Sequence, residues 1–206
     1  MNKNFFTILL AIFVAISLAS CDRDNDDNSI DEPQPQLGVM INGVEWARTN
    51  VDAPGTFAAT PESAGMFFQW NCRQGWPATG SGTPTGWNST GATGNTWTRE
   101  NDPCPQGWRV PTDDEFQSLN RSGSVWTTRS GVNGRLFGTA PNQIFLPAVG
   151  SRDLDGTLQD AGSWGNYWAS TQGSAIFADQ LWFTSSLSWN WLHVRGRGNS
   201  VRCVAR

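Results

Sequence analysis

The amino-acid sequence predicts an α+β fold for residues 38–206, rich in strands and loops and with one or two short helices. Asn42-Gly43 separates two apolar segments and favours a tight β-hairpin, because both residues tolerate positive φ. Thr112 and Glu115 have the spacing of a helix capping box. The chain has 22 Gly and 12 Trp but only 1 Tyr, a composition typical of many short strands packed around large aromatic side chains.

The strands are predicted from apolar or alternating segments of the domain. In chain order these are 39–41, 44–50, 65–71, 143–149, 167–170, 181–194 and 199–205. The single marked helix follows Thr112, and Asp113 and Asp114 place negative charge in its first turn, where the helix dipole favours it. We therefore interpret the acidic residues there as helix-capping groups rather than catalytic carboxylates.

Turn residues divide the rest of the domain. Asn133-Gly134 and Asp155-Gly156 predict two further turns. Residues 74–98 are rich in Gly, Thr, Pro and Asn and predict a long irregular region. Long loops in compact domains often carry function, so this region is a candidate for ligand binding.

The first 20 residues resemble a bacterial lipoprotein signal peptide. The uncharged run from Phe5 to Leu18 is too short for a spanning helix, which needs about 20 residues. Leu18-Ala19-Ser20-Cys21 resembles a lipobox, which implies that Cys21 receives a diacylglycerol and a further acyl chain such as palmitate. Such a group would anchor the chain in a membrane, because each buried methylene contributes about 0.8 kcal/mol. An ordinary secretory signal that happens to end near a cysteine is the alternative.

Residues 21–37 form the lipidated cysteine and an acidic linker, which we expect to be disordered because it has almost no apolar content. Its start resembles the acidic stretch of surface-exported lipoproteins of Bacteroidota, which implies an outer-membrane protein on the extracellular side. A solvated spacer without an address function is the alternative. Without leader and linker the domain is formally neutral, since 12 acidic and 12 basic residues remain of 18 and 14. A neutral domain without a basic stripe argues against nucleic acid as a partner.

Five segments together resemble one protein family. They are Ile41-Asn42-Gly43-Val44-x-Trp46-Ala47, Asp102-Pro103-Cys104-Pro105-x-Gly107-Trp108-Arg109-Val110-Pro111-Thr112, Gly134-Arg135 to Phe145-Leu146-Pro147, Tyr167-Trp168-Ala169-Ser170-Thr171 and Ser200-Val201-Arg202-Cys203-Val204. In this order they resemble the Fibrobacter succinogenes major paralogous domain of secreted and surface proteins. The resemblance covers nearly all of 38–206 and implies a single domain with a C-type-lectin-like fold.

The resemblance also implies a disulfide bond between Cys104 and Cys203. Cys72 is then left over, as a buried thiol or a residue that pairs with another chain. Members of the family often have Glu where this chain has Gln172, so a cation at that segment is not expected here.

The sequence offers no convincing catalytic or metal site, and we predict a protein that is not an enzyme and binds no cofactor. His193 is the only histidine, and nothing in the sequence places a nucleophile beside it. No His and Cys residues have zinc spacing. Asp153-Leu154-Asp155-Gly156 has part of a calcium-loop pattern, but a simple turn explains it better.

Recognition is the function class that the composition favours, because indole faces stack on sugar rings and fill protein interfaces. Trp46, Trp108 and Trp168 lie inside the family motifs and are expected in the core. The candidate ligand-binding residues are Trp76, Trp87, Trp189 and Trp191. The sequence therefore predicts an adhesin-like domain at the cell surface that binds a glycan or a protein. The alternative is a structural or accessory subunit of a fimbria-like surface assembly.

Overall fold

The structure is a computed structural model that describes residues 37–91 and 93–206. The predicted signal peptide, the lipid attachment at Cys21 and the linker up to residue 36 lie outside the described residues. Within those residues, no helix combines the length and the apolar character that a membrane span requires.

The described residues contain one helix and fourteen strands. The elements are β1 (Gly38–Ile41), β2 (Val44–Ala47), β3 (Met66–Phe68), β4 (Gly75–Pro77), β5 (Trp108–Arg109), α1 (Asp113–Arg121), β6 (Ser124–Arg129), β7 (Val132–Thr139), β8 (Asn142–Pro147), β9 (Ser151–Arg152), β10 (Leu158–Gln159), β11 (Gly165–Gln172), β12 (Phe177–Phe183), β13 (Ser188–Val194) and β14 (Val204–Ala205).

The predicted α+β class, and the C-type-lectin-like fold named with it, is therefore wrong, because the protein is mostly β. Only α1 combines a capping box with apolar side chains at helical spacing, and this nine-residue helix buries just Phe116 and Leu119. The rest of the domain has short alternating or apolar segments, whose side chains are buried by pairing strands rather than by helices.

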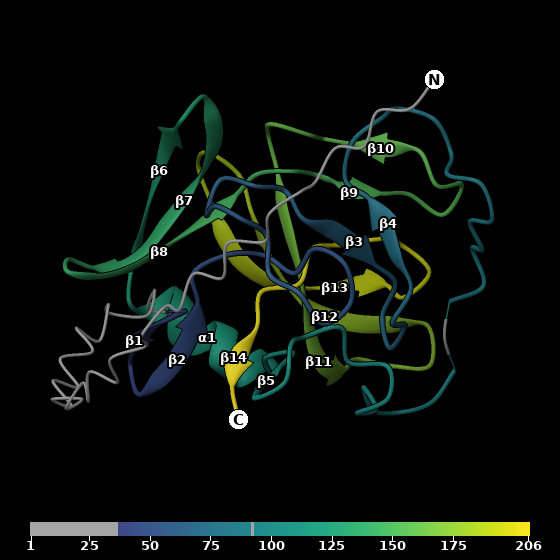
Figure 1. Cartoon of the computed structure of the whole chain (residues 1–206), viewed down its shortest axis with the longest axis horizontal. Coiled ribbons are helices and arrows are strands. Elements are labelled where there is room, and N and C mark those ends of the chain that lie inside the picture. Colours follow the sequence, from purple (N-terminus) through teal and green to yellow (C-terminus); the bar gives the residue numbers. More distant parts are fainter. Residues whose placement is uncertain (1–36, 92) are drawn as a thin grey trace, which may run out of the picture. The chain divides into compact units, whose positions relative to one another are not determined.

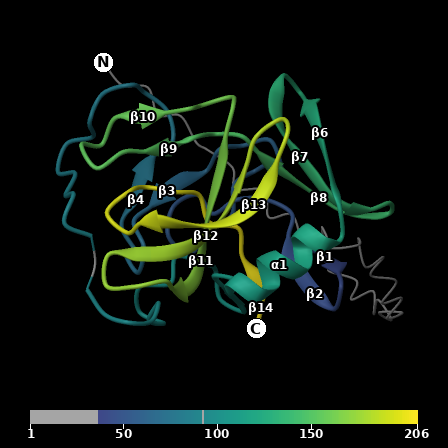
Figure 2. The same cartoon turned by 180° about the vertical axis from the view of Figure 1, so that it is seen from behind.

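The strands of the described residues form five small antiparallel sheets. Their orders are β1-β2-β14-β5, β3-β4, β6-β7-β8, β9-β10 and β11-β12-β13. Figures 1 and 2 show β6–β8 to one side of the β11–β13 sheet, and β3, β4, β9 and β10 to the other. The C-terminal strand β14 pairs with both β2 and β5, so the two ends of the domain meet in one sheet.

Three of the predicted local elements are confirmed. Asn42 and Gly43 have φ of 49° and 79° and connect β1 to β2 as a hairpin. Thr112 caps α1, since its side chain accepts from the backbone N–H of Glu115 while the Glu115 carboxylate accepts from the backbone N–H of Thr112. The turn at Asp155-Gly156 is also present, with Gly156 at φ 83°.

The turn predicted at Asn133-Gly134 is wrong, because both residues lie inside β7. The turn falls instead at Ser130 and Gly131, which have φ of 48° and 81°. Gly134 serves packing rather than a turn, since a Cβ on it would lie 2.6 Å from the ring of Phe145. An Asn-Gly pair in the sequence does not distinguish these two uses of glycine.

The core is built mainly from aromatic side chains. Trp46, Trp70 and Trp168 are 0% exposed, and Trp108 is buried, so the core placement predicted for Trp46, Trp108 and Trp168 is confirmed. The buried indole N–H groups of Trp70 and Trp168 donate to the carbonyl oxygens of Ala169 (2.9 Å) and Phe68 (2.7 Å). These bonds join the segment around β3 to β11.

The disulfide bond between Cys104 and Cys203 is present, as the resemblance implies. Its Cα atoms are 6.0 Å apart, and the two cysteines are 99 positions apart in the sequence. Closing so long a loop is worth roughly 2–5 kcal/mol in an oxidising environment. Cys72 is a free thiol and is half-buried.

The guanidinium of Arg202 is fully buried and holds three distant segments together. It donates to the side-chain oxygen of Asn50 (3.0 and 2.7 Å) and to the carbonyl oxygens of Ala47 (3.1 Å), Arg48 (2.7 Å) and Phe145 (3.1 Å). Burial lowers the pKa of Arg202 to about 10, which still leaves it charged at neutral pH. No carboxylate in the described part of the chain is among its partners, so carbonyl and amide dipoles stabilise the charge.

Arg152 likewise donates hydrogen bonds to backbone carbonyl oxygens, most of them in the glycine-rich loop after β4. Its buried guanidinium donates to the carbonyl oxygens of Pro77, Thr79, Gly80, Gly82 and Gly156. Arginine therefore satisfies carbonyl groups at the end of β4, in the loop after it and in the turn at Gly156.

Replacing Arg202 by methionine, Arg202→Met, is expected to lower the free energy of unfolding by at least about 3 kcal/mol, because several buried acceptors lose their donor together. Urea denaturation followed by tryptophan fluorescence measures this. Arg121→Met, at an exposed position of α1, is the matched control and should change stability by no more than about 0.5 kcal/mol. Equal effects of the two substitutions would contradict the role given to Arg202.

Candidate functional site

The candidate site lies on one face of the β11-β12-β13 sheet and is built by strand register. Trp182 of β12 lies opposite Trp189 of β13, and Gln180 lies opposite Trp191. On the other side of β12, Asn166 of β11 pairs with Trp182. Because side chains two residues apart share a face, these five side chains project to the same side of the sheet.

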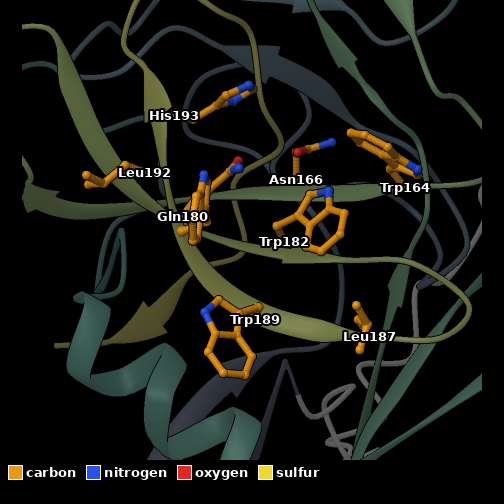
Figure 3. Close-up of a pocket in the computed structure, with 9 residues that line it drawn as sticks. Trp164, Asn166, Gln180, Trp182, Leu187, Trp189, Leu192 and His193 are labelled. Atoms are coloured by element: carbon orange, nitrogen blue, oxygen red, sulfur yellow. The ribbon is translucent and has the colours of Figure 1, made fainter.

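A groove of about 540 Å³ covers this face (Figure 3). Its walls are Trp164, Trp182, Trp189 and Trp191 with Leu187 and Leu192, and its floor holds Asn166, Gln180 and His193. Trp164 packs edge-on against Trp182 with ring centroids 5.3 Å apart. Trp189 and Trp191 are 62% and 65% exposed, although large apolar side chains are usually buried. Such an open aromatic groove with a few polar groups is the usual form of a ligand site.

Hydrogen bonds fix the floor of the groove. Arg197 approaches Nε2 of His193 at 3.1 Å, and because arginine can only donate, Nε2 must accept. Nδ1 then carries the proton and donates to Oδ1 of Asn199 (3.2 Å), whose Nδ2 donates to Oε1 of Gln180 (2.8 Å). Arg197 is itself held by Asp153 at 2.9 Å. This series of side-chain contacts, which runs from Asp153 to Gln180, therefore orients the polar groups of the floor.

His193 is neutral and fully engaged in this network. Burial, followed by the positive charge of Arg197, lowers the pKa of His193 to about 4. Its ring also contacts Trp168, with centroids 5.7 Å apart. Both ring nitrogens face a partner, so the imidazole is poorly placed to take a proton from a nucleophile.

Asn166 differs from its neighbours in the floor. Its side chain is 2% exposed, and its Nδ2 has no hydrogen-bond partner among the described residues. In Figure 3 this nitrogen is turned toward Trp164. Buried amide groups are nearly always paired, so an unpaired donor in a groove marks a point where a ligand can bind.

The four tryptophans selected from the sequence fall into two groups. Trp189 and Trp191 line the groove. Trp76 is buried and packs edge-on against Trp87 at 5.2 Å, and Nε1 of Trp87 donates to the carbonyl oxygen of Leu154 (2.8 Å). Trp76 and Trp87 thus form a separate pair away from the groove lining.

Sequence reasoning did not select Trp164, Asn166, Gln180 or Trp182. The signal for Trp182 was present in residues 181–194, which contain a hairpin rather than one strand, with the turn closed by Thr184 and Leu187. Once the turn is placed at residues 184–187, the register of the hairpin sets Trp182 opposite Trp189. Asn166 lies on β11 and Gln180 on β12. Which face of the sheet their side chains occupy depends on how the strands pair, so the local sequence gave no signal for them.

The Asp153–Gly156 segment forms a turn, as predicted. Oδ1 of Asp155 accepts from the backbone N–H and the hydroxyl of Thr157 at 2.9 and 2.7 Å. Among residues 37–91 and 93–206, no three acidic, histidine or cysteine side chains cluster in a way that could hold a metal ion.

Comparisons of the chain with protein-family models, with curated proteins and with solved structures find no match. The resemblance to the Fibrobacter succinogenes major paralogous domain therefore stays a prediction from the motifs. The geometry of the groove is the main evidence on function.

Acidification is expected to destabilise the protein through His193. The unfolded chain binds a proton on His193 with a pKa near 6.5, whereas the folded chain does so only near pH 4. The free energy of unfolding should therefore fall as the pH is lowered from about 6.5 to 4, by at most about 3 kcal/mol from this residue. Denaturation curves of the natural protein and His193→Gln measure it. If their stability difference does not change between pH 7 and 4.5, His193 is not buried as a neutral ring.

Proposed function

We propose that the protein is a lipoprotein of the outer membrane, facing outward, whose domain recognises a glycan without catalysis. One observation carries this proposal: four tryptophans surround an open groove whose floor holds two buried amide side chains. Indole faces bind the apolar face of a pyranose ring, and amides exchange hydrogen bonds with its polar groups. The lipobox resemblance at Cys21 supports the membrane anchor.

The arrangement of the groove supports binding of sugar rings in particular. Trp189 and Trp191 lie two residues apart on β13 and share one face, so adjacent rings of a glycan could contact both. The network through Gln180 and Asn199 holds the floor in place before a ligand arrives, which reduces the entropy lost on binding.

A non-catalytic role agrees with the chemistry of the floor. His193 is its one titratable side chain, and this ring is neutral with both nitrogens engaged. A general acid or base needs a free nitrogen within reach of a reacting group.

The substitutions Trp189→Ala and Trp191→Ala are each expected to weaken glycan binding at least about tenfold, because a stacking surface worth more than 1 kcal/mol is removed. The measurement is a glycan-array screen of the full chain displayed multivalently, followed by titration with the best glycan, with calcium and with a chelator. Val125→Ala, at an exposed residue outside the groove, is the control. A blank array with folded protein would contradict the proposal.

The free edge of β13 favours a second function, as a structural subunit of a fimbria-like assembly. In the described residues β13 pairs only with β12. The backbone N–H of Thr184 donates to the carbonyl oxygen of Leu187, and that of Arg195 donates to Ile176. Hydrogen-bonded and non-hydrogen-bonded pairs alternate along an antiparallel ladder, so these two bonds determine which residues of β13 bond to β12. The backbone N–H and C=O groups of Asn190 and Leu192 therefore point away from β12. An unpaired edge can accept a strand from a neighbouring subunit.

Leu192→Pro tests this second function, because it removes an outward N–H without breaking the ladder to β12. If β13 joins subunits, chemical cross-linking on cells should give high-mass species with the natural chain and at least about tenfold less with Leu192→Pro. Val125→Ala should behave like the natural chain. Equal cross-linking of all three proteins would contradict a subunit role for this edge.

A further inference from the structure

The unpaired amide of Asn166 limits what can occupy the floor of the groove. Its Nδ2 is a buried donor that faces no acceptor in the described residues. This nitrogen is already shielded from water in the free protein, and it has no partner there. A ligand that supplies an acceptor atom at this point gains a hydrogen bond that the free protein does not make.

The other polar groups of the floor restrict the acceptor further. Oε1 of Gln180 already accepts from Asn199, and Nε2 of His193 already accepts from Arg197. A sugar hydroxyl on the floor would also bring its own O–H donor, whereas Oε1 of Gln180 and Nε2 of His193 each already accept one hydrogen bond. A carbonyl oxygen brings only acceptor capacity and therefore fits better.

The walls beside Asn166 are apolar. In Figure 3 the Asn166 amide lies beside Trp182, and its nitrogen is turned toward Trp164. These two indoles pack edge to face, with ring centroids 5.3 Å apart. A group that accepts a hydrogen bond from Asn166 would thus have indole surface next to it, which suits a methyl group adjacent to the carbonyl.

Charge limits the ligand as well. No side chain that lines the groove is charged, since His193 is neutral. The nearest guanidinium in the network, Arg197, is already paired with Asp153. A uronic acid or an amino sugar would lose hydration in the groove without gaining an opposite charge.

We propose that the groove binds neutral N-acetylated sugars, with the acetamido carbonyl accepting a hydrogen bond from Nδ2 of Asn166 and the acetamido methyl lying against Trp164 and Trp182. This inference rests on the proposed glycan-binding function and names the sugar class that Asn166 selects. Trp189 and Trp191 supply stacking that any pyranose can use, whereas Asn166 discriminates the substituent.

The test compares two ligands that differ at the substituent on C2 alone. The N-acetylglucosamine trimer and the glucose trimer, both β-1,4-linked, are titrated into the full chain in detergent micelles and followed by calorimetry and tryptophan fluorescence. The acetamido trimer is expected to bind at least about tenfold more tightly. Asn166→Leu, which keeps similar volume but has no donor, should abolish this preference while the weaker stacking contribution remains.

Two controls separate loss of the donor from loss of the fold. Asn142→Leu changes an exposed asparagine of β8 outside the groove and should leave the preference intact. Thermal unfolding shows whether Asn166→Leu is folded, and the ligand pair on the natural chain tests the proposal even if that variant does not fold.

The outcomes distinguish this inference from the proposed function. Comparable binding of both trimers, weakened by Trp191→Ala, would overturn the acetamido specificity and leave glycan recognition in place. A preference that persists in folded Asn166→Leu would also overturn it. Binding of neither trimer, combined with a blank glycan array, would overturn both.

Discussion

The buried guanidinium of Arg202 is the interaction on which the rest of the architecture depends. Five small sheets cannot share one continuous hydrogen-bonded network, so carbonyl groups at their ends need other donors. Arg202 satisfies acceptors on β2, on β8 and in the connecting backbone after β2, and Arg152 does so for the loop after β4. All basic residues of the domain are arginine, whose planar fork can bind several carbonyls at once.

The same C-terminal segment that carries Arg202 also builds the groove. Asn199 exchanges backbone hydrogen bonds with Phe68 and places its side chain between His193 and Gln180, while the backbone N–H of Ser200 donates to the carbonyl oxygen of Asn166. The disulfide at Cys203 ties this segment to the loop before β5. The groove floor is therefore positioned by the core, and its walls by the hairpin of β12 and β13.

Sequence reasoning predicted the local elements well where one short motif determines the structure. The β1–β2 hairpin at Asn42-Gly43 and the capping box at Thr112 are examples. The fold class failed because one well-marked helix received too much weight against many short strands. Half of the selected tryptophans line the groove, but Trp76 and Trp87 pack against each other, and no local pattern reports such long-range pairing. Asn166 and Gln180 were missed because only the pairing of the strands places their side chains on the face of the sheet that forms the groove.

The absence of charge from the groove has a consequence for the capture of the ligand that we propose. No charged side chain lines the groove, so a neutral ligand is not steered toward it, and single encounters proceed at about 10⁵–10⁶ M⁻¹ s⁻¹. Affinity of this kind is insensitive to ionic strength, because there is no ion pair to screen. Under the proposed function, many copies on one membrane would hold a repetitive polymer through avidity rather than through the strength of any one contact.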